Sequence, residues 1–328
     1  MTLSNLEIAA LAGVGIFCAI TIKRHYCGFG PFGPMHGFGP WSHGPWRGYG
    51  YGPMLGYGGS CGPMRGHGPM GYKNGFRSAS YRFDQLNLVG KTPLTHDVDH
   101  YTFALASSDK PSTQIPITAP VLLKMPTGEA RPFTPIYNSD KDYLHFAIKN
   151  YNRSASGALS KMPIGSSGVS ITGPLPHIDL QNTEGKFKQV YLIGAGAGIT
   201  PLWSFLTSSL NKSDSQTKLK LIYSNHSKED IIFKEEIDEL KMKYPNRLDV
   251  VHVLSEADYE ANYTGRLNPE ILKNEIDYVG PDAKVLVSGP PQFISMVAGT
   301  KRGPPFAQGQ LGGALREIGF TKDQVVKF

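Results

Sequence analysis

Residues 190–201 constrain the fold of this chain more than any other part of the sequence. Four apolar residues run into three evenly spaced glycines, and a Thr-Pro pair follows. Glycine lets a backbone turn tightly and approach a phosphate, and Thr and Pro are favoured where a helix begins. The pattern predicts a buried strand, a dinucleotide-binding turn and a helix, with a plain strand–helix turn as the alternative. The candidate dinucleotide-binding residues are Gly194, Gly196, Gly198, Ile199, Thr200 and Pro201.

The sequence around this turn alternates between apolar runs and amphipathic stretches, which predicts a parallel sheet covered by helices. Further strands are expected at residues 219–223, 248–253 and 285–287, and helices at 200–210 and 228–244. We therefore predict an α/β NAD-binding domain over residues 184–328. Ligands of open α/β sheets bind at the carboxyl ends of the strands. The last predicted strand ends there in Ser288, Gly289, Pro290 and Pro291, although such a loop alone is an ordinary turn.

The part of the chain before this domain has a different pattern of apolar and turn residues. Short β-like runs are separated by turn residues, which suits a small antiparallel barrel. We therefore predict a β-barrel domain over residues 77–183. The expected strands lie at residues 83–89, 99–106, 119–124, 143–148 and 169–172.

Two motifs inside the predicted barrel suggest a cofactor. A flavin site needs a cation for the pyrophosphate, an aromatic ring against the isoalloxazine and a small hydroxyl near its hydrogen-bonding edge. Arg131, Phe133 and Thr134 supply these types within a short extended stretch, which must bend because alternation puts Thr134 on the other face. In residues 157–160, a glycine before a short helix would leave backbone N–H groups free for phosphate. A plain helix start is the alternative for the second motif.

The N-terminal quarter of the chain differs from the rest. Residues 8–22 carry no charge and are followed by Lys23 and Arg24, so residues 1–26 are expected to anchor the chain in a membrane as a transmembrane helix. An ordinary buried helix is the alternative. Residues 27–76 are rich in Gly and Pro and are expected to form a disordered, flexible linker. Adhesion to a membrane or partner, and metal binding by His36, His43 and His67, are the other interpretations of the linker.

Charge and cysteine content exclude several functions for the body of the chain. Most of the net charge of +6 lies in residues 1–76, and no basic cluster with interleaved aromatic residues indicates nucleic-acid binding. The three cysteines, Cys18, Cys27 and Cys61, all lie in the N-terminal quarter. We therefore expect neither a disulfide framework nor a thiolate metal site in the body.

The order and spacing of the motifs resemble the ferredoxin–NADP reductase superfamily, and within it the NADH–cytochrome b5 reductase family, especially its fungal mitochondrial forms. The resemblance covers residues 77–328 and includes the closing segment after Gln308. It implies that FAD and NADH are the cofactors and that Asp230 favours NADH by repelling a 2′-phosphate. Thr134 and Ser288 would lie at the reacting rings. The implied FAD-binding residues are Arg131, Pro132, Phe133, Thr134, Lys149, Gly157, Ala158, Leu159 and Ser160.

Several positions depart from the family's pattern. Phe133 stands where the family usually has Tyr, and Ser288 stands where it usually has Cys. Tyr137 replaces a customary Ser, and Ala195 and Ala197 replace residues that are usually Gly and Thr. Stacking by Phe133 should survive, whereas lost hydrogen bonds would cost about 0.5–1.5 kcal/mol each.

The resemblance implies a reductase that passes electrons from NADH through a flavin to a one-electron haem protein such as cytochrome b5. Two alternatives remain: a divergent mitochondrial flavoprotein that assists haem attachment to cytochrome c, and a non-enzymatic membrane adaptor. The expected location is a mitochondrial membrane, either the outer membrane or one facing the intermembrane space. The endoplasmic reticulum membrane is the alternative.

Overall fold

The computed structural model describes residues 83–105, 115–136, 143–151, 154–180, 186–213, 215–258, 261–302 and 307–328. The chain divides into two units, Met1–Lys73 and Asn74–Phe328, and every described residue belongs to the second. The predicted anchor, the predicted linker and Tyr137 lie outside the described residues. Among the helices of the described part, none is both long and apolar enough to cross a membrane.

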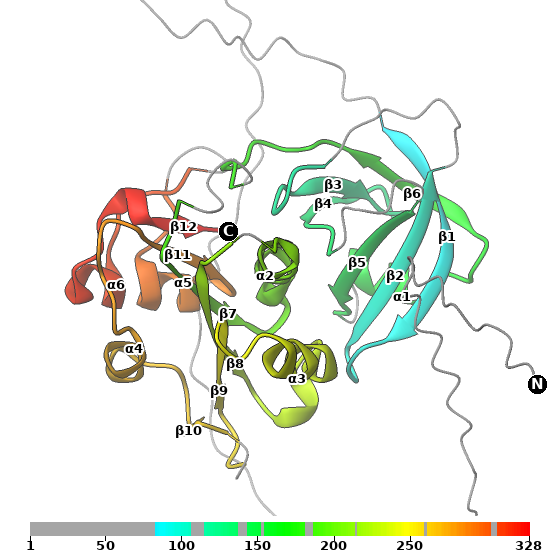
Figure 1. Ribbon diagram of the computed structural model, residues 1–328. Helices are drawn as coiled ribbons and strands as arrows, with labels where there is room; N and C mark the ends of the chain where they lie inside the picture. Colours follow the sequence, from blue (N-terminus) through cyan, green and yellow to red (C-terminus); the bar gives the residue numbers. More distant parts are fainter. Residues whose placement is uncertain are drawn as a thin grey trace, which may run out of the picture. The chain divides into compact units, whose positions relative to one another are not determined.

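Residues 83–180, here called the antiparallel half, form one six-stranded sheet in the order β4-β3-β6-β1-β2-β5 (Figure 1). Side chains alternate between core and surface, so that Leu86, Leu88, Tyr101 and Phe103 are fully buried. The Ile136 amide donates to the His145 carbonyl at 2.9 Å, which joins the segment after β4 to β5. The two ends of the sheet therefore meet. The strands are β1 (Asp84–Pro93), β2 (Val98–Leu105), β3 (Val121–Lys124), β4 (Ala130–Phe133), β5 (Tyr143–Lys149) and β6 (Ser167–Thr172).

Residues 186–328, here called the parallel half, form a six-stranded parallel sheet in the order β10-β9-β8-β7-β11-β12. This half starts with the central strand β7, and β8, β9 and β10 are added on one side of it while β11 and β12 are added on the other. The strand order therefore reverses between β7 and β11. Ligands of such sheets bind in the crevice at this reversal. The strands are β7 (Gln189–Ala195), β8 (Lys218–Asn225), β9 (Leu248–Leu254), β10 (Tyr263–Thr264), β11 (Ala283–Ser288) and β12 (Val325–Lys327).

Helices cover both faces of the parallel sheet (Figure 1). Val190 and Leu192 of β7 pack with α2 (Ile199–Asn211) and α3 (Lys234–Lys243). Tyr191 and Ile193 pack on the opposite face. The helices there are α4 (Pro269–Glu275), α5 (Pro291–Ala298) and α6 (Gly313–Ile318). Both faces of β7 are buried, which explains its continuous apolar sequence.

Two predicted helices differ from the structure. The predicted helix at 228–244 is wrong, because η3 (Lys228–Asp230) and α3 are separate. Between them Ile231, Ile232 and Phe233 are all buried, and three consecutive residues cannot share one helix face. Phe233 has a φ of 62° and stacks on Trp203, with ring centroids 4.6 Å apart. The short helix α1 (Ala155–Ser160) is capped by Ser154, so Gly157 lies inside it rather than before it.

Candidate active site

A cavity of about 720 Å³ is lined by residues from both halves of the described chain. From the antiparallel half, the predicted cofactor residues that line it are Arg131, Pro132, Phe133, Thr134 and Lys149. From the parallel half, they are Gly198, Thr200, Pro201 and Ser288. Residues 131–134 and residues 198–201, which are far apart in the sequence, therefore line the same cavity.

The remaining predicted residues do not line this cavity. Residues 157–160 lie within α1, and the residues of that region which do line the cavity are Ser154, Ala155 and Ser156. In the parallel half, Gly194 belongs to β7 and Ile199 to α2, and neither lines the cavity. Gly196, Asp230, Gly289, Pro290 and Pro291 are also absent from the wall.

Phe133 and Arg131 are positioned by strand pairing. Phe133 pairs with Val121 of β3, and its ring packs partly buried against the core of the antiparallel half. The Arg131 side chain is 62% exposed and forms an ion pair with Glu129. A phosphate near Arg131 would therefore compete with Glu129 for the guanidinium group.

Helix α2 ties this strand to the parallel half. The Ser204 hydroxyl donates to the Pro135 carbonyl at 2.7 Å and lies 3.3 Å from that of Ile136. Ser204 is buried, so the bond is shielded from water. It holds the segment after Thr134 against the helix that begins at the glycine turn.

Lys149 supplies a positive charge from β5. Its ammonium group lies 2.7 Å from the Asp97 carboxylate. Burial acts to lower the pKa of Lys149, but the hydrogen bond and charge of Asp97 outweigh it and raise the pKa. Lys149 is therefore fully charged at neutral pH.

The glycine turn approaches β11 through backbone atoms alone. A Cβ atom at Gly198 would lie 2.6 Å from the Ser288 carbonyl oxygen and 2.7 Å from the Gly289 nitrogen. Gly196 has a φ of 52°, and a Cβ built there would meet no atom within 4 Å. The turn is thus closed on the β11 side and open on the other. The backbone N–H groups at the start of α2 make a phosphate-binding end of the kind that such turns provide.

The C-terminal segment forms part of the cavity wall, which sequence reasoning did not predict. Lys301, Gln308, Lys327 and Phe328 line the cavity. The Lys327 ammonium is buried and donates to the carbonyls of Ala298, Gly299 and Gln310, the last at 2.9 Å. Burial lowers the pKa of Lys301, and burial together with the charge of Lys301 lowers that of Lys327. The similarity of the closing segment to the reductase family was the only sequence signal for it.

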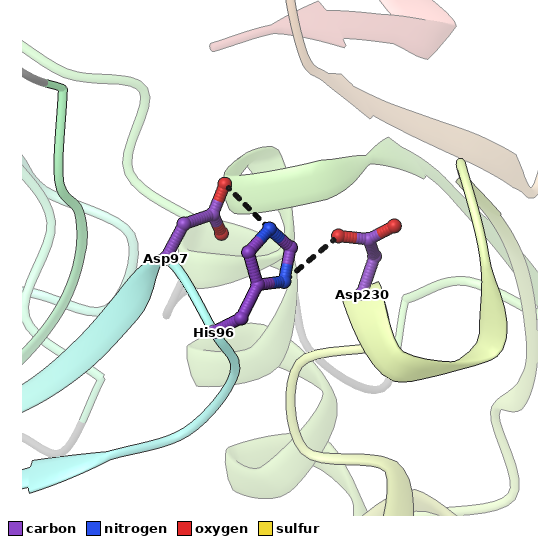
Figure 2. A group of neighbouring side chains, drawn as sticks. All are labelled: His96, Asp97 and Asp230. Carbon is purple, nitrogen blue, oxygen red and sulfur yellow. Dashed lines mark ion pairs between the residues drawn. The ribbon is translucent and has the colours of Figure 1, made fainter. Parts of the chain in front are cut away.

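Asp230 lies at the junction of the two halves. One of its carboxylate oxygens accepts from the Ser227 amide and hydroxyl, both at 2.9 Å. The other oxygen faces His96, whose Nδ1 lies 3.6 Å away. Figure 2 shows the His96 ring between Asp230 and Asp97, and its Nε2 lies 3.6 Å from the latter. These three residues could bind a metal ion by distance, but nothing else in the described part indicates one.

The chemistry of the lining residues fits a flavin dinucleotide. Arg131 and Lys149 provide cations for a pyrophosphate, and the Phe133 ring provides an apolar face. Ser154, Ser156 and Thr134 add hydroxyl groups that can donate and accept hydrogen bonds. The open glycine turn at Gly196 offers a second phosphate-binding end for a nicotinamide dinucleotide.

Comparison with known proteins agrees with this assignment. The family model of the oxidoreductase FAD-binding domain matches residues 85–179, and that of the oxidoreductase NAD-binding domain matches residues 192–299. NADH-cytochrome b5 reductase 2 of Lodderomyces elongisporus is 35% identical over 74% of this chain and 82% of its own length. The Candida albicans protein of the same name is 34% identical over 74% of this chain and 82% of its own length.

Solved structures show the same fold. The cytochrome b5 reductase domain of Ulva prolifera nitrate reductase superposes with a TM-score of 0.63 at 20% identity, covering 75% of this chain and 97% of that domain. The CS-b5R domains of human Ncb5or, in the NAD+ form, give a TM-score of 0.64 at 25% identity, covering 77% and 71%.

Fold and site together define a two-domain oxidoreductase that uses FAD and NADH. More specifically, the chain belongs to the NADH–cytochrome b5 reductase family. It is an NADH-dependent flavin oxidoreductase.

Proposed function

We propose that this protein passes electrons from NADH through FAD to a one-electron haem protein, with cytochrome b5 as the acceptor. The observation that carries the proposal is the shared cavity. Phe133 and Thr134 line it from the antiparallel half, and Gly198 and Ser288 line it from the parallel half. The proposed flavin-ring site and the proposed nicotinamide site would therefore share one cavity. The acceptor is inferred from the names of the relatives, which are NADH-cytochrome b5 reductases.

The residues of the chain bind and align the two cofactors. When bound, FAD supplies hydride acceptance and single-electron release, which side chains cannot provide. Phe133 offers its ring as a support for the flavin, and Thr134 offers a hydroxyl beside it. Arg131 and Lys149 neutralise phosphate charge. No side chain is needed as a general base, because the two bound cofactors would supply the hydride chemistry and the chain would only align them.

The parallel half positions the nicotinamide through close backbone packing. Gly198 lets the turn after β7 touch residues 288–289 at the end of β11, which leaves Ser288 on the cavity wall. Ser288 is 5% exposed, so the wall there is shielded from bulk water. Exclusion of water from this wall would limit loss of the hydride to side reactions. Asp230 would favour NADH by repelling the 2′-phosphate of NADPH.

We also propose a membrane location for the protein. The uncharged run at residues 8–22, followed by Lys23 and Arg24, supports an N-terminal anchor. Residues 27–76 would then tether the reductase body to the membrane. The expected membrane is mitochondrial. Fractionation of cells that express the full chain, compared with a variant lacking residues 1–26, tests this: loss of membrane association only in the shortened variant is the expected result.

Spectroscopy of the purified full chain tests the reductase function. Flavin absorbance bands should bleach on anaerobic addition of NADH and return on addition of ferric cytochrome b5. Asp230→Ser serves as the matched variant, because it should accept NADPH better while binding the same flavin. Bands that bleach with NADH and are restored by ferricyanide but not by cytochrome b5 would show that the acceptor is a different haem protein. A colourless protein would contradict the flavin assignment.

A further inference from the structure

His96 lies in the turn between β1 and β2, and hydrogen bonds of the neighbouring residues hold this turn in place. The Thr95 amide donates to the Val98 carbonyl at 3.1 Å, and the Thr95 hydroxyl accepts from the Val98 amide at 3.1 Å. The Asp97 carbonyl accepts from the Asn150 amide at 2.7 Å. The backbone at His96 is therefore positioned by the fold of the antiparallel half and not by contacts of its own side chain.

Asp230 faces this turn from the parallel half. It follows β8, the neighbour of β7, and so lies near the carboxyl ends of these strands. The Ser227 amide and hydroxyl hold one oxygen of its carboxylate, both at 2.9 Å. The other oxygen lies 3.6 Å from His96 Nδ1, and Figure 2 shows the imidazole ring between Asp230 and Asp97. Asp230 is thus oriented by its own half, and its second oxygen points across the junction to His96.

The gap between His96 and Asp230 suits a hydroxyl group. A separation of 3.6 Å is too long for a direct hydrogen bond between Nδ1 and the carboxylate oxygen. A hydroxyl beside the two atoms can accept from Nδ1–H and donate to the carboxylate at the same time. A phosphate carries negative charge, so the carboxylate would repel it. The side chains are 67% and 17% exposed, so a ligand can reach both.

This pair lies beside the cavity assigned to the cofactors. Lys149 lines that cavity, and its ammonium group lies 2.7 Å from an Asp97 oxygen. The same oxygen lies 3.6 Å from His96 Nε2, so a run of close contacts leads from the cavity wall to Asp230. In dinucleotide-binding sheets of this kind, an acidic residue bonds the 2′-hydroxyl of the ribose. The adenosine end of a dinucleotide that leaves the cavity past the glycine turn would therefore meet His96 and Asp230 together.

We propose that His96 is a coenzyme-binding residue that contributes to specificity. Its Nδ1–H donates to the 2′-hydroxyl of the adenosine ribose of NADH, and Asp230 accepts from the same hydroxyl. The inference rests on the proposed function, in which Asp230 selects NADH. The sequence motifs assign this selection to Asp230 alone, whereas the structure brings a residue of the antiparallel half opposite it. The two halves thus share the recognition of the coenzyme.

A coenzyme that lacks the hydroxyl tests this contact directly. With ferricyanide as the acceptor, His96→Ala in the full chain should raise the KM for NADH by roughly 2- to 12-fold, the value of one hydrogen bond, with kcat within about 2-fold. With reduced nicotinamide 2′-deoxyadenine dinucleotide, His96→Ala and wild type should have equal KM values, because the hydroxyl is already missing. His96→Asn is the matched variant: its amide nitrogen can replace Nδ1, so its KM for NADH should stay within about 2-fold of wild type.

The flavin content of the variants should equal that of wild type, because His96 does not line the cavity. An equal rise in KM for the two dinucleotides would overturn the proposal, since His96 would then act without contacting the hydroxyl. A KM for NADH that His96→Ala leaves unchanged would overturn it as well. In both cases the wild-type chain still oxidises NADH. A flavin-loaded wild-type chain that NADH does not reduce would instead overturn the proposed function, and the role of His96 with it.

Discussion

The two halves of the molecule build one cavity by different means. Strands of the antiparallel half alternate between buried and accessible residues, as β1 does, and they present side chains such as Phe133 and Lys149 to the cavity. In β7 of the parallel half every residue from Val190 to Gly194 is buried. The glycine turn after β7 contributes backbone rather than side chains. Substitutions should therefore act through side-chain chemistry in the first half and through backbone packing in the second.

Adding one methyl group to the glycine turn should have the largest effect on activity. Gly198→Ala would place Cβ 2.6 Å from the Ser288 carbonyl, which cannot move without shifting β11. We expect a roughly 10- to 100-fold fall in kcat/KM for NADH with FAD content unchanged, since overpacking costs about 1–3 kcal/mol. Steady-state kinetics and the ratio of flavin to protein absorbance measure both quantities.

Gly90→Ala is the counterpart in the antiparallel half. A Cβ atom there would meet only the Thr102 side chain, at 3.3 Å. We expect less than about a 2-fold change in kcat/KM, because a side chain can adjust. Equal losses in the two variants would show that the halves do not differ in the way described.

The junction between the halves depends on a buried hydroxyl. Ser204→Ala removes the 2.7 Å bond to the Pro135 carbonyl and leaves that carbonyl without its partner from α2. We expect the free energy of unfolding to fall by about 1–3 kcal/mol. Urea unfolding followed by flavin release measures it. Thr207→Ala is the control, because the Thr207 hydroxyl bonds only to carbonyls of its own helix, and a loss as large as that of Ser204→Ala would contradict the role of the junction.

The sequence predicted the strands better than it predicted the site. The apolar runs of β7, β8, β9 and β11 and the glycine turn are local signals, and the structure confirms these strands. The helix break at Phe233 could not be predicted from periodicity, because it depends on stacking against Trp203 from another helix. The prediction placed the start of α1 at Gly157, which lies inside the helix, because the cap is Ser154.

The residues of the cavity wall show more clearly that features set by long-range contacts cannot be predicted from local sequence patterns. Lys327 reaches it because β12 pairs with β11 and brings the C-terminus to the crevice, and Lys301 lines it from the segment after α5. Thr118, which also lines the cavity, gave no sequence signal, because its φ of 66° belongs to a turn position that normally has glycine. Local patterns thus indicated some of the residues that line the cavity in each half, whereas the long-range contacts that complete the cavity had to come from the structure.

Acid should weaken the antiparallel half through its half-buried pair of histidines. His100 Nε2 lies 3.1 Å from His145 Nδ1, and burial, assisted by the charge of His145, lowers the pKa of His100 from 6.5 to about 4. Between these values the unfolded chain binds more protons, so stability present above pH 6.5 is lost as the pH falls toward 4. Because His100 is partly exposed, we expect a loss of about 1–2 kcal/mol between pH 7 and pH 4.5.

Substituting one histidine in each half shows how much of this loss of stability each half contributes. His100→Gln should flatten the pH dependence of the urea midpoint, since the glutamine does not titrate. Burial also lowers the pKa of His252 in β9 of the parallel half, so the double variant with His252→Gln should be flatter still. A steep acid loss that persists in the double variant would place its origin in the carboxylates instead.

The exposed contact between the halves should matter least. His96 lies 3.6 Å from both Asp97 and Asp230, but its side chain is 67% exposed, and ion pairs of this kind contribute about 0–1 kcal/mol. His96→Ala should therefore lower the free energy of unfolding by less than about 0.5 kcal/mol, because Ser227 still holds the Asp230 carboxylate. The same urea experiment measures it beside Ser204→Ala. A loss equal to that of Ser204→Ala would mean that the exposed pair joins the two halves as strongly as the buried hydroxyl on α2 does.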